Sequence, residues 1–418
     1  MSYCLALGFK TKERRTKVKK VYLLLGVLLT LSLMVSSCAA PSGGTGTPQV
    51  DVIKIGLNAE LTGSIPKVGK SCKQGAELAL KEINDAGGLE VAGKKYPVQL
   101  FVEDDEDKAD QAASVTQKLI SQYGVLAVIG PNASRNGIPA AEIAESAKVP
   151  LIGPWPTNPK FTIDSKTGQP KKYVFRMMYL DSVQGVENAR FVMEEFKAKK
   201  VAVLYDIASE YNKGMADVFK KSFEELGGEV VAFESYTSGD KDFTAQLTKI
   251  KAANPDVIFL PNYYSEVALQ SQQAHNLGIT SILMTTDASF SSELLTLGGK
   301  NVEGIYLYST FTIEVGGVNP AAKKFIDAYK AQYGEFPDDV AALTYDSFGV
   351  IFQAIQKAEK IDRQAVRDVL ATPFTYEGVT GKTTFTGTGD PLKSVYYVQV
   401  TDGQFKVYTP KYYHAKEQ

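Results

Sequence analysis

Short apolar runs alternate with amphipathic stretches twice along this chain, and that alternation constrains the fold more than any other feature. The first series has apolar runs at 52–57 and 125–129, with a predicted helix at 69–86 between them. A second series begins at the apolar run 201–205 and ends at 282–285. Alternation of this kind favours parallel sheets with helices on both faces. The sequence therefore predicts an α/β protein with two doubly wound parallel-sheet lobes.

Beyond residue 311 the pattern changes to helices followed by a hairpin. We expect helices at 319–333, 340–358 and 363–370, and a hairpin-like end at 395–408. A body of about 370 residues is large enough for two domains of ordinary size. Two lobes with a cleft between them are a common setting for a small-molecule site.

The amino-terminal end is typical of an export signal. Residues 10–20 hold seven Lys or Arg and one Glu, and an uncharged apolar run follows at 21–35. A basic region, a short apolar region and small residues in this order indicate a signal peptide over 1–37. The apolar run is shorter than the roughly 20 residues of a membrane-spanning helix. The Gly-, Pro-, Ser- and Thr-rich stretch 38–50 predicts a flexible tether.

Val35-Ser36-Ser37-Cys38 resembles the lipobox of bacterial lipoproteins. The resemblance implies that Cys38 becomes the lipidated first residue and anchors the protein to the membrane. The stretch departs from the commonest lipobox, with Val in place of Leu and Ser in place of Gly or Ala before the Cys. An uncleaved signal anchor is the alternative, because 21–40 carries no charge. Either way, we expect an exported protein that faces the periplasm or the cell exterior.

Composition excludes several other classes of protein. Removing the seven basic residues and one acidic residue of the leader from the chain's 46 and 47 leaves 39 basic and 46 acidic residues, a net charge of −7. No basic stripe remains to suit nucleic acid, so we expect no nucleic-acid partner. The cysteines are Cys4, Cys38 and Cys72, which leaves one thiol in the body and no internal disulfide.

The stretch 125–157 predicts half of a binding site. It contains two apolar runs, each followed by a small polar turn, and Ser134 and Thr157 are the hydroxyl residues at those turns. Ligands of open parallel sheets bind at this edge, because strand ends and helix N-termini leave backbone donors unpaired there. A hydroxyl at a helix start can join these donors in binding an anion. Two simpler interpretations stay open: Ser134 as a plain helix cap, and Thr157 as a turn residue.

Several pieces of the body occur in the order and spacing of one known family. They include IGLNAELTG (55–63), GAELALKEINDAGG (75–88), VIGPNAS (128–134), VPLIGPWPTNP (149–159) and GDKDFT (239–244). The chain resembles the leucine/isoleucine/valine-binding type of solute receptor for ABC importers, which has the type I periplasmic-binding-protein fold. The resemblance implies crossover hinges between two lobes. One lobe would comprise 51–180 with 311–394, and the other 181–310 with 395–418.

The resemblance also implies roles for particular residues. Ser134 and Thr157 match the family's hydroxyl residues that bind the carboxylate of the ligand. Asp287 matches an acidic position that pairs with the ligand's ammonium group. A carboxylate in a partly dry cleft is costly unless it is paired, so it selects a cation there. A simpler role for Asp287 is to cap a helix predicted at 290–297.

Aromatic residues complete the expected site. Tyr211 and Tyr263 match positions of the second lobe that close over the ligand, although each could be an ordinary core or surface tyrosine. Trp155, the only tryptophan, falls where valine and leucine binders commonly have a small residue. Its indole could wall the pocket or stack on the ligand, or it could be a buried or lobe-contact aromatic. Val68 stands where some members place a tyrosine, so that contact is expected to be absent.

Motifs for catalysis and metal binding are weak. The acidic run 103–107 lacks the ligand spacing and the glycine of an EF-hand, and it predicts a strand-to-helix turn. The stretch 381–383 lacks the first glycine of a phosphate-binding loop. His275 and His414 fit neither a metal site nor a catalytic triad. We therefore expect no enzyme, no cofactor and no metal.

These observations predict a monomeric, lipid-anchored receptor that captures an amino acid between its lobes and delivers it to the permease subunits of an ABC importer. A branched-chain amino acid is the default ligand, but Trp155 and Asp287 leave aromatic, polar or amide ligands open. A sensory receptor domain that acts with a signalling partner is the alternative function. An enzyme built on the same lobes is disfavoured, because the sequence has no nucleophile–base or metal spacing.

Overall fold

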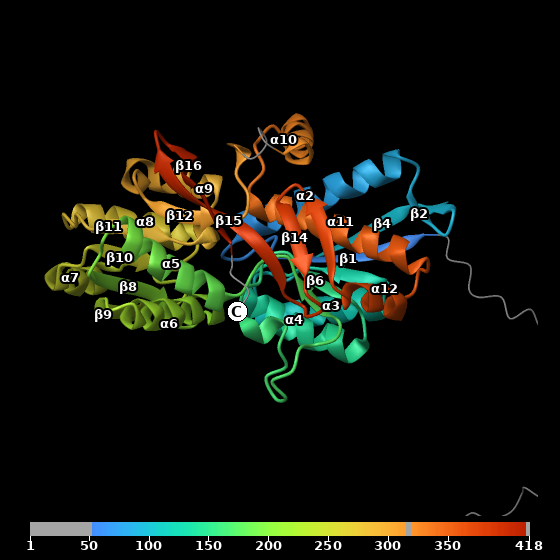
Figure 1. Cartoon of the computed structure of the whole chain (residues 1–418), viewed down its shortest axis with the longest axis horizontal. Helices are drawn as coiled ribbons and strands as arrows, with labels where there is room; N and C mark the ends of the chain where they lie inside the picture. Colours follow the sequence, from blue (N-terminus) through green and yellow to red (C-terminus); the bar gives the residue numbers. More distant parts are fainter. Residues whose placement is uncertain (1–51, 315–318, 415–418) are drawn as a thin grey trace, which may run out of the picture. The chain divides into compact units, whose positions relative to one another are not determined.

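The computed structural model describes residues 52–314 and 319–414, whose longer strands form two large sheets (Figure 1). The predicted signal peptide, Cys38 and the predicted tether lie outside the described residues. The first sheet has the strand order β4-β1-β5-β6-β7, with every pair parallel. Its strands are β1 (Ile53–Ala59), β4 (Val98–Asp104), β5 (Ala127–Ile129), β6 (Leu151–Gly153) and β7 (Val174–Arg176).

Helices cover both faces of the first sheet, because its strands are apolar on both sides. Ala127 and Ile129 of β5 belong to one core with α2 (Pro66–Asp85) and α11 (Asp339–Ala358), whereas Val128 belongs to another core with α3 (Ala109–Ser121) and α4 (Ser134–Ala147). Successive side chains of a strand point to opposite faces, so one run of apolar residues supplies both cores. α10 (Pro320–Tyr333) packs on α2, and α12 (Arg363–Leu370) packs on α11.

The second sheet has the order β9-β8-β10-β11-β12, again parallel, and β15 then joins it antiparallel to β12. Its strands are β8 (Lys200–Asp206), β9 (Glu229–Tyr236), β10 (Val257–Leu260), β11 (Ile282–Thr285) and β12 (Tyr306–Ser309). The helices that accompany it are α5 (Asp181–Glu195), α6 (Glu210–Glu225), α7 (Thr244–Ala253), α8 (Tyr264–Asn276) and α9 (Ser292–Gly298). The fold class is therefore the predicted one, an α/β protein with two doubly wound sheets.

Strand β15 (Pro391–Thr401) is shared by two sets of strands. Residues 391–393 pair with β14 (Gly381–Phe385), whereas 396–399 pair with β12 of the second sheet. β13 (Phe374–Gly378) extends the ladder beyond β14, and β16 (Gln404–His414) forms the predicted terminal hairpin with β15. The chain passes from the first sheet to the second after β7, and after β12 it returns to α11, which packs on α2 beside the first sheet (Figure 1).

Some short strands were not predicted from the sequence. They are β12, the β13–β14 pair and a small hairpin of β2 (Leu89–Val91) with β3 (Lys94–Tyr96). The strands of the two hairpins have several half-buried or exposed positions, and so they lack the continuous apolar run that marks β8 or β10. Their positions are set by pairing with distant strands or by a tight turn. In the described part of the chain, no helix has the length and apolar character needed to cross a membrane.

Candidate ligand-binding site

A buried glutamate fixes the turn that follows β5. Glu60 directly follows β1. Its Oε1 accepts hydrogen bonds from the backbone N–H groups of Asn132 (2.9 Å) and Ala133 (2.8 Å), and its Oε2 accepts one from Asn132 Nδ2 (2.8 Å). The turn needs Gly130, because its φ is +87° and a Cβ there would lie 2.0 Å from the carbonyl oxygen of Asn58. These contacts place Ser134 at the first residue of α4, at the carboxyl edge of the first sheet.

Ser134 and Thr157 meet at this edge although they are 23 positions apart. The Oγ atom of Ser134 accepts hydrogen bonds from the backbone N–H groups of Thr157 and Asn158, each at 3.3 Å. The N-cap residue of α4 is Ala133, and the Ser134 side chain makes no capping bond. The interpretation of Ser134 as a plain helix cap is therefore wrong. Thr157 is buried, and within the described residues its Oγ1 has no hydrogen-bond partner.

Asp287 lies at the carboxyl edge of the second sheet, in the short 3-10 helix η2 (Asp287–Ser289) that follows β11. It does not cap α9, whose N-cap is Ser291, with its side chain accepting from the N–H of Glu293. The Tyr211 hydroxyl lies 2.7 Å from Thr286 Oγ1 and 3.4 Å from Asp287 Oδ1. The interpretation of Asp287 as a helix cap is therefore also wrong.

Burial controls the protonation of Asp287. Loss of hydration raises the pKa of this carboxyl to about 7, the hydroxyls of Tyr308 and Tyr211 oppose the rise, and the neighbouring carboxylate of Asp181 adds to it. The side chain is 2% exposed. A carboxylate in such a place is poorly stabilised without a cation, so a ligand ammonium group would find a partner there.

Three aromatic rings pack together between the two edges. The ring centroids of Trp155 and Tyr263 are 6.1 Å apart, and those of Tyr211 and Tyr263 are 5.9 Å apart. The guanidinium group of Arg135, on α4, lies 5.1 Å from the Tyr263 ring centroid, and its Nε donates to Asp107 Oδ1 at 2.9 Å. Tyr211 lies in the first turn of α6 and Tyr263 is the N-cap of α8, both beside the second sheet, so these contacts join the two sides of the cleft.

All six predicted ligand-contact residues line one cavity of about 180 Å³. The lining residues are Asn132, Ser134, Trp155, Thr157, Tyr211, Tyr263, Asp287 and Ala288. Tyr211 and Tyr263, for which a core or surface position was the alternative, therefore both face this space. Val68, expected to make no ligand contact, is buried in α2 and is not among the lining residues.

Sequence reasoning missed several residues near this cavity. Asn132 lines it directly, while Asp181, Tyr308 and Asp339 surround Asp287 closely enough to act on protonation there. Asn132 belongs to the same polar turn as Ser134, so that turn was the signal that could have identified it. Tyr308 and Asp339 come from β12 and α11, far along the chain, and no local pattern places them beside the turn.

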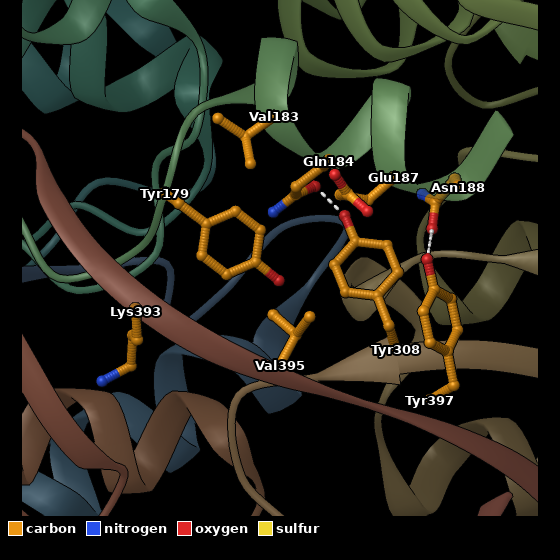
Figure 2. A pocket seen from close by; sticks show the side chains of 9 residues that line it. All are labelled: Tyr179, Val183, Gln184, Glu187, Asn188, Tyr308, Lys393, Val395 and Tyr397. Atoms are coloured by element: carbon orange, nitrogen blue, oxygen red, sulfur yellow. Dashed lines mark hydrogen bonds between the residues drawn. The ribbon is translucent and has the colours of Figure 1, made fainter. Parts of the chain in front are cut away.

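A second cavity, of about 280 Å³, lies where the chain passes between the sheets (Figure 2). Tyr179 precedes α5, Gln184 lies on α5, and Tyr308 lies on β12. The Tyr308 hydroxyl donates to Gln184 Oε1. Lys393 and Val395 of β15 form another wall. The Lys393 ammonium group donates to Thr380 and Thr383 at 2.6 and 2.8 Å. None of the predicted ligand contacts lines this cavity.

The acidic run 103–107 has a structural role in the described chain. Asp105 Oδ1 accepts the N–H of Asp107 at 2.9 Å, and Asp107 pairs with Arg135. Among the described residues, no group of three or more His, Cys, Asp or Glu side chains is arranged to hold a metal ion. This run is the expected strand-to-helix turn between β4 and α3.

Two doubly wound sheets, with hydroxyl groups at one carboxyl edge and a buried carboxylate at the facing edge, define a two-lobed solute-binding protein. The sequence model of the family described as periplasmic binding protein matches residues 52–404, and the chain belongs to this family. The family binds solutes and is not enzymatic. Membership implies a location outside the cytoplasm.

Relatives narrow the resemblance. The chain is 31% identical over 361 residues to the leucine-, isoleucine-, valine-, threonine- and alanine-binding protein of Pseudomonas aeruginosa. The aligned region covers 86% of this chain and 92% of that protein. A leucine-binding protein from Thermotoga maritima matches with a TM-score of 0.79 and 34% identity, over 85% of this chain and 98% of that one. These matches confirm the expected family and its type I fold.

A solved structure with a ligand is also similar. It is a branched-chain amino acid transporter substrate-binding protein from Streptococcus pneumoniae in complex with isoleucine. The TM-score is 0.78 and the identity is 35%, over 87% of this chain and 99% of that one. A substrate-binding role for this chain follows from these relatives and the family.

Proposed function

We propose that this protein captures an amino acid in the 180 Å³ cavity and delivers it to the permease subunits of an ABC importer. One observation carries the proposal: hydroxyl groups at the start of α4 and a buried carboxylate beyond β11 line the same cavity. A hydroxyl at a helix N-terminus suits the ligand's carboxylate, and Asp287 suits its ammonium group. The relatives named for binding amino acids support this assignment.

In this proposal Ser134 and Thr157 bind the carboxylate from one lobe, and Asp287, Tyr211 and Tyr263 bind from the other. Trp155 walls the pocket. The first lobe would comprise 51–180 with 311–394, and the second 181–310 with 395–418. A ligand that touches both lobes favours the closed form by its higher affinity for that form. The permease would recognise the closed, loaded receptor.

Calorimetric titration of the purified protein with the common amino acids tests the proposed function. We expect saturable one-to-one binding of at least one of them. A folded protein that binds no amino acid at millimolar ligand would contradict the proposal.

Contacts across the cleft support closure around the ligand. Asn158 Nδ2 donates to the carbonyl oxygen of Glu210 at 3.0 Å, and Lys160 Nζ lies 2.8 Å from Glu210 Oε2. The Lys160–Glu210 pair is exposed and therefore contributes little. The stacking of Arg135 on Tyr263 is more protected, because the Arg135 side chain is 20% exposed and Tyr263 is buried.

Replacing Arg135 with lysine should weaken binding of every ligand by about 2- to 5-fold, because lysine keeps the charge beside Asp107 but loses the planar stack on Tyr263. Calorimetry measures the change. Arg367→Lys is the matched control. The Arg367 guanidinium group lies 5.0 Å from the Tyr173 ring centroid, outside the cleft, so this variant should bind with unchanged affinity. Equal affinities for the two variants would remove Arg135 from the closure mechanism.

We also propose that the protein acts as a monomer and that lipidated Cys38 tethers it to the membrane; the lipobox-like sequence supports the tether. Replacing Cys38 with serine should abolish lipid attachment, because serine lacks the thiol that carries the lipid, and should leave residues 1–37 uncleaved. Mass spectrometry of the mature amino terminus measures the modification. A wild-type protein that keeps residues 1–37 and carries no lipid would instead indicate a signal anchor.

A further inference from the structure

Two polar groups of the lining residues have no role in holding the ligand's carboxylate or ammonium group. They are Oδ1 of Asn132 and Nε1 of Trp155, and in the described part of the chain neither has a hydrogen-bond partner. Both residues are almost fully buried, with 1% and 5% of their surface exposed. Buried polar atoms are normally paired, so an acceptor and a donor left open beside a ligand cavity point to a group of the ligand.

The orientation of the Asn132 amide is set by its surroundings. Its Nδ2 donates to Glu60 Oε2 at 2.8 Å, and Glu60 Oε1 already accepts two backbone N–H groups. The amide oxygen is therefore the free end of this side chain, and it is an acceptor. The ligand group that it meets must carry an N–H or O–H donor.

The indole N–H of Trp155 has an acidic neighbour that does not satisfy it. Asp339, the first residue of α11, is close enough for the indole to oppose the rise in its pKa that burial and the charge of Asp287 cause. Yet neither carboxyl oxygen of Asp339 forms a hydrogen bond among the residues that the structure describes. The Trp155 N–H thus remains a donor without a partner among the described residues, on a side chain that lines the cavity.

The lining of the cavity combines aromatic rings with polar side chains. The rings belong to Trp155, Tyr211 and Tyr263, and Asn132, Ser134, Thr157 and Asp287 are the polar residues. The rings can pack against an aliphatic side chain, but a branched aliphatic side chain would leave the open polar atoms of Asn132 and Trp155 desolvated and unpaired, which is costly.

We propose that the ligand is an amino acid whose side chain ends in a hydroxyl or carboxamide group, recognised by Asn132 and Trp155, and not a branched-chain aliphatic amino acid. This inference rests on the proposed amino-acid-binding function and names the class of ligand at the same site. Asn132 accepts from the side-chain group, and Trp155 donates to it.

Isosteric ligand pairs test the inference. Threonine and valine have nearly the same shape, as do asparagine and leucine, and each pair differs in polar groups. We expect calorimetry to show that the polar member of at least one pair binds about tenfold or more tightly, because its partner leaves buried polar groups unpaired. Valine and leucine binding as tightly as threonine and asparagine, or more tightly, would overturn the inference while leaving amino-acid capture intact.

Trp155→Phe removes the indole N–H and keeps an aromatic wall. It should reduce the polar-to-apolar affinity ratio several-fold in the preferred pair, and an unchanged ratio would overturn the role of Trp155. Tyr306→Phe is the control for loss of one polar atom from an aromatic ring, because Tyr306 lies on β12 and does not line the cavity. Thermal unfolding of each variant establishes that it is folded. If no amino acid binds the folded wild type, the proposed function itself fails.

Discussion

Replacing Asp287 with asparagine should weaken amino-acid binding by about 100-fold or more, because removing one partner of a buried ion pair leaves the other charge uncompensated. Asparagine has the same shape, so the cavity should keep its form and the loss should come from the ligand's ammonium group. Calorimetry with the preferred amino acid measures the effect. A variant that binds with wild-type affinity would show that the ammonium group lies elsewhere.

The same residue should make binding depend on pH. The ligand-free pKa of Asp287 is about 7, and its surroundings contain acids and phenols: Asp181, Asp339, Tyr179, Tyr211 and Tyr308. Pairing with an ammonium group requires the ionised carboxylate, so binding below pH 7 must release a proton. Affinity should therefore fall by up to about tenfold per pH unit as pH drops below 7, and level off above it. The Asp287→Asn variant should lose this slope.

The stability of the ligand-free fold should depend on pH in the opposite direction to the binding affinity. The folded pKa of Asp287 is raised above the ordinary carboxyl value of 3.8, so the folded state holds the proton more tightly than the unfolded state. The stabilisation from this group is fully present below about pH 3.8 and is lost as pH rises through about 7. The melting temperature of the ligand-free protein should fall from pH 6 to pH 8 more than that of Asp287→Asn. Equal slopes would assign the effect to other acids.

Replacing Ser134 with alanine should weaken binding by about 10- to 150-fold, which corresponds to one hydrogen bond to a charged group. Ser134 is the first residue of α4, and its Oγ accepts from two backbone N–H groups at 3.3 Å. The substitution therefore removes a hydroxyl group from the anion-binding end of that helix. Calorimetry with the same amino acid measures the change.

The control for this variant is Ser114→Ala, because Ser114 is an exposed residue of α3 whose hydroxyl bonds only to the carbonyl oxygen of Asp110. It should leave affinity unchanged. A Ser134→Ala protein indistinguishable from this control would place the ligand's carboxylate at another set of donors.

The sequence predicted those parts of the fold that a local pattern encodes. β11 was predicted with its observed bounds, because a short apolar run follows Gly278, which ends a helix with a positive φ. The turns at Ser134 and Thr157 could be placed because each follows a buried strand. The resemblance to a family added Asp287 and the two tyrosines, which periodicity alone does not mark.

Features set by packing between distant segments could not be predicted. The Asn132 side chain becomes a fixed acceptor only because Glu60, 72 positions away, binds its amide N–H. Asp339 comes close to Trp155 only because α11 returns to pack on α2. β12 pairs with β11 and β15, and β14 pairs with β13 and β15, and nothing in their own residues marks that pairing.

We expect the shared strand β15 to act as a flexure between the two lobes. Residues 391–393 are clamped to β14, whose partner β13 contacts α11, whereas 396–399 are clamped to β12 of the second sheet. If the lobes rotate against each other, residues 394–395, which pair with β16 and with neither clamp, should take up the motion as a change in backbone torsion without sliding along the strand. The hydrogen-bond registers at both clamps would then survive every cycle of opening and closing, which lets the two faces of the cleft meet in the same alignment each time.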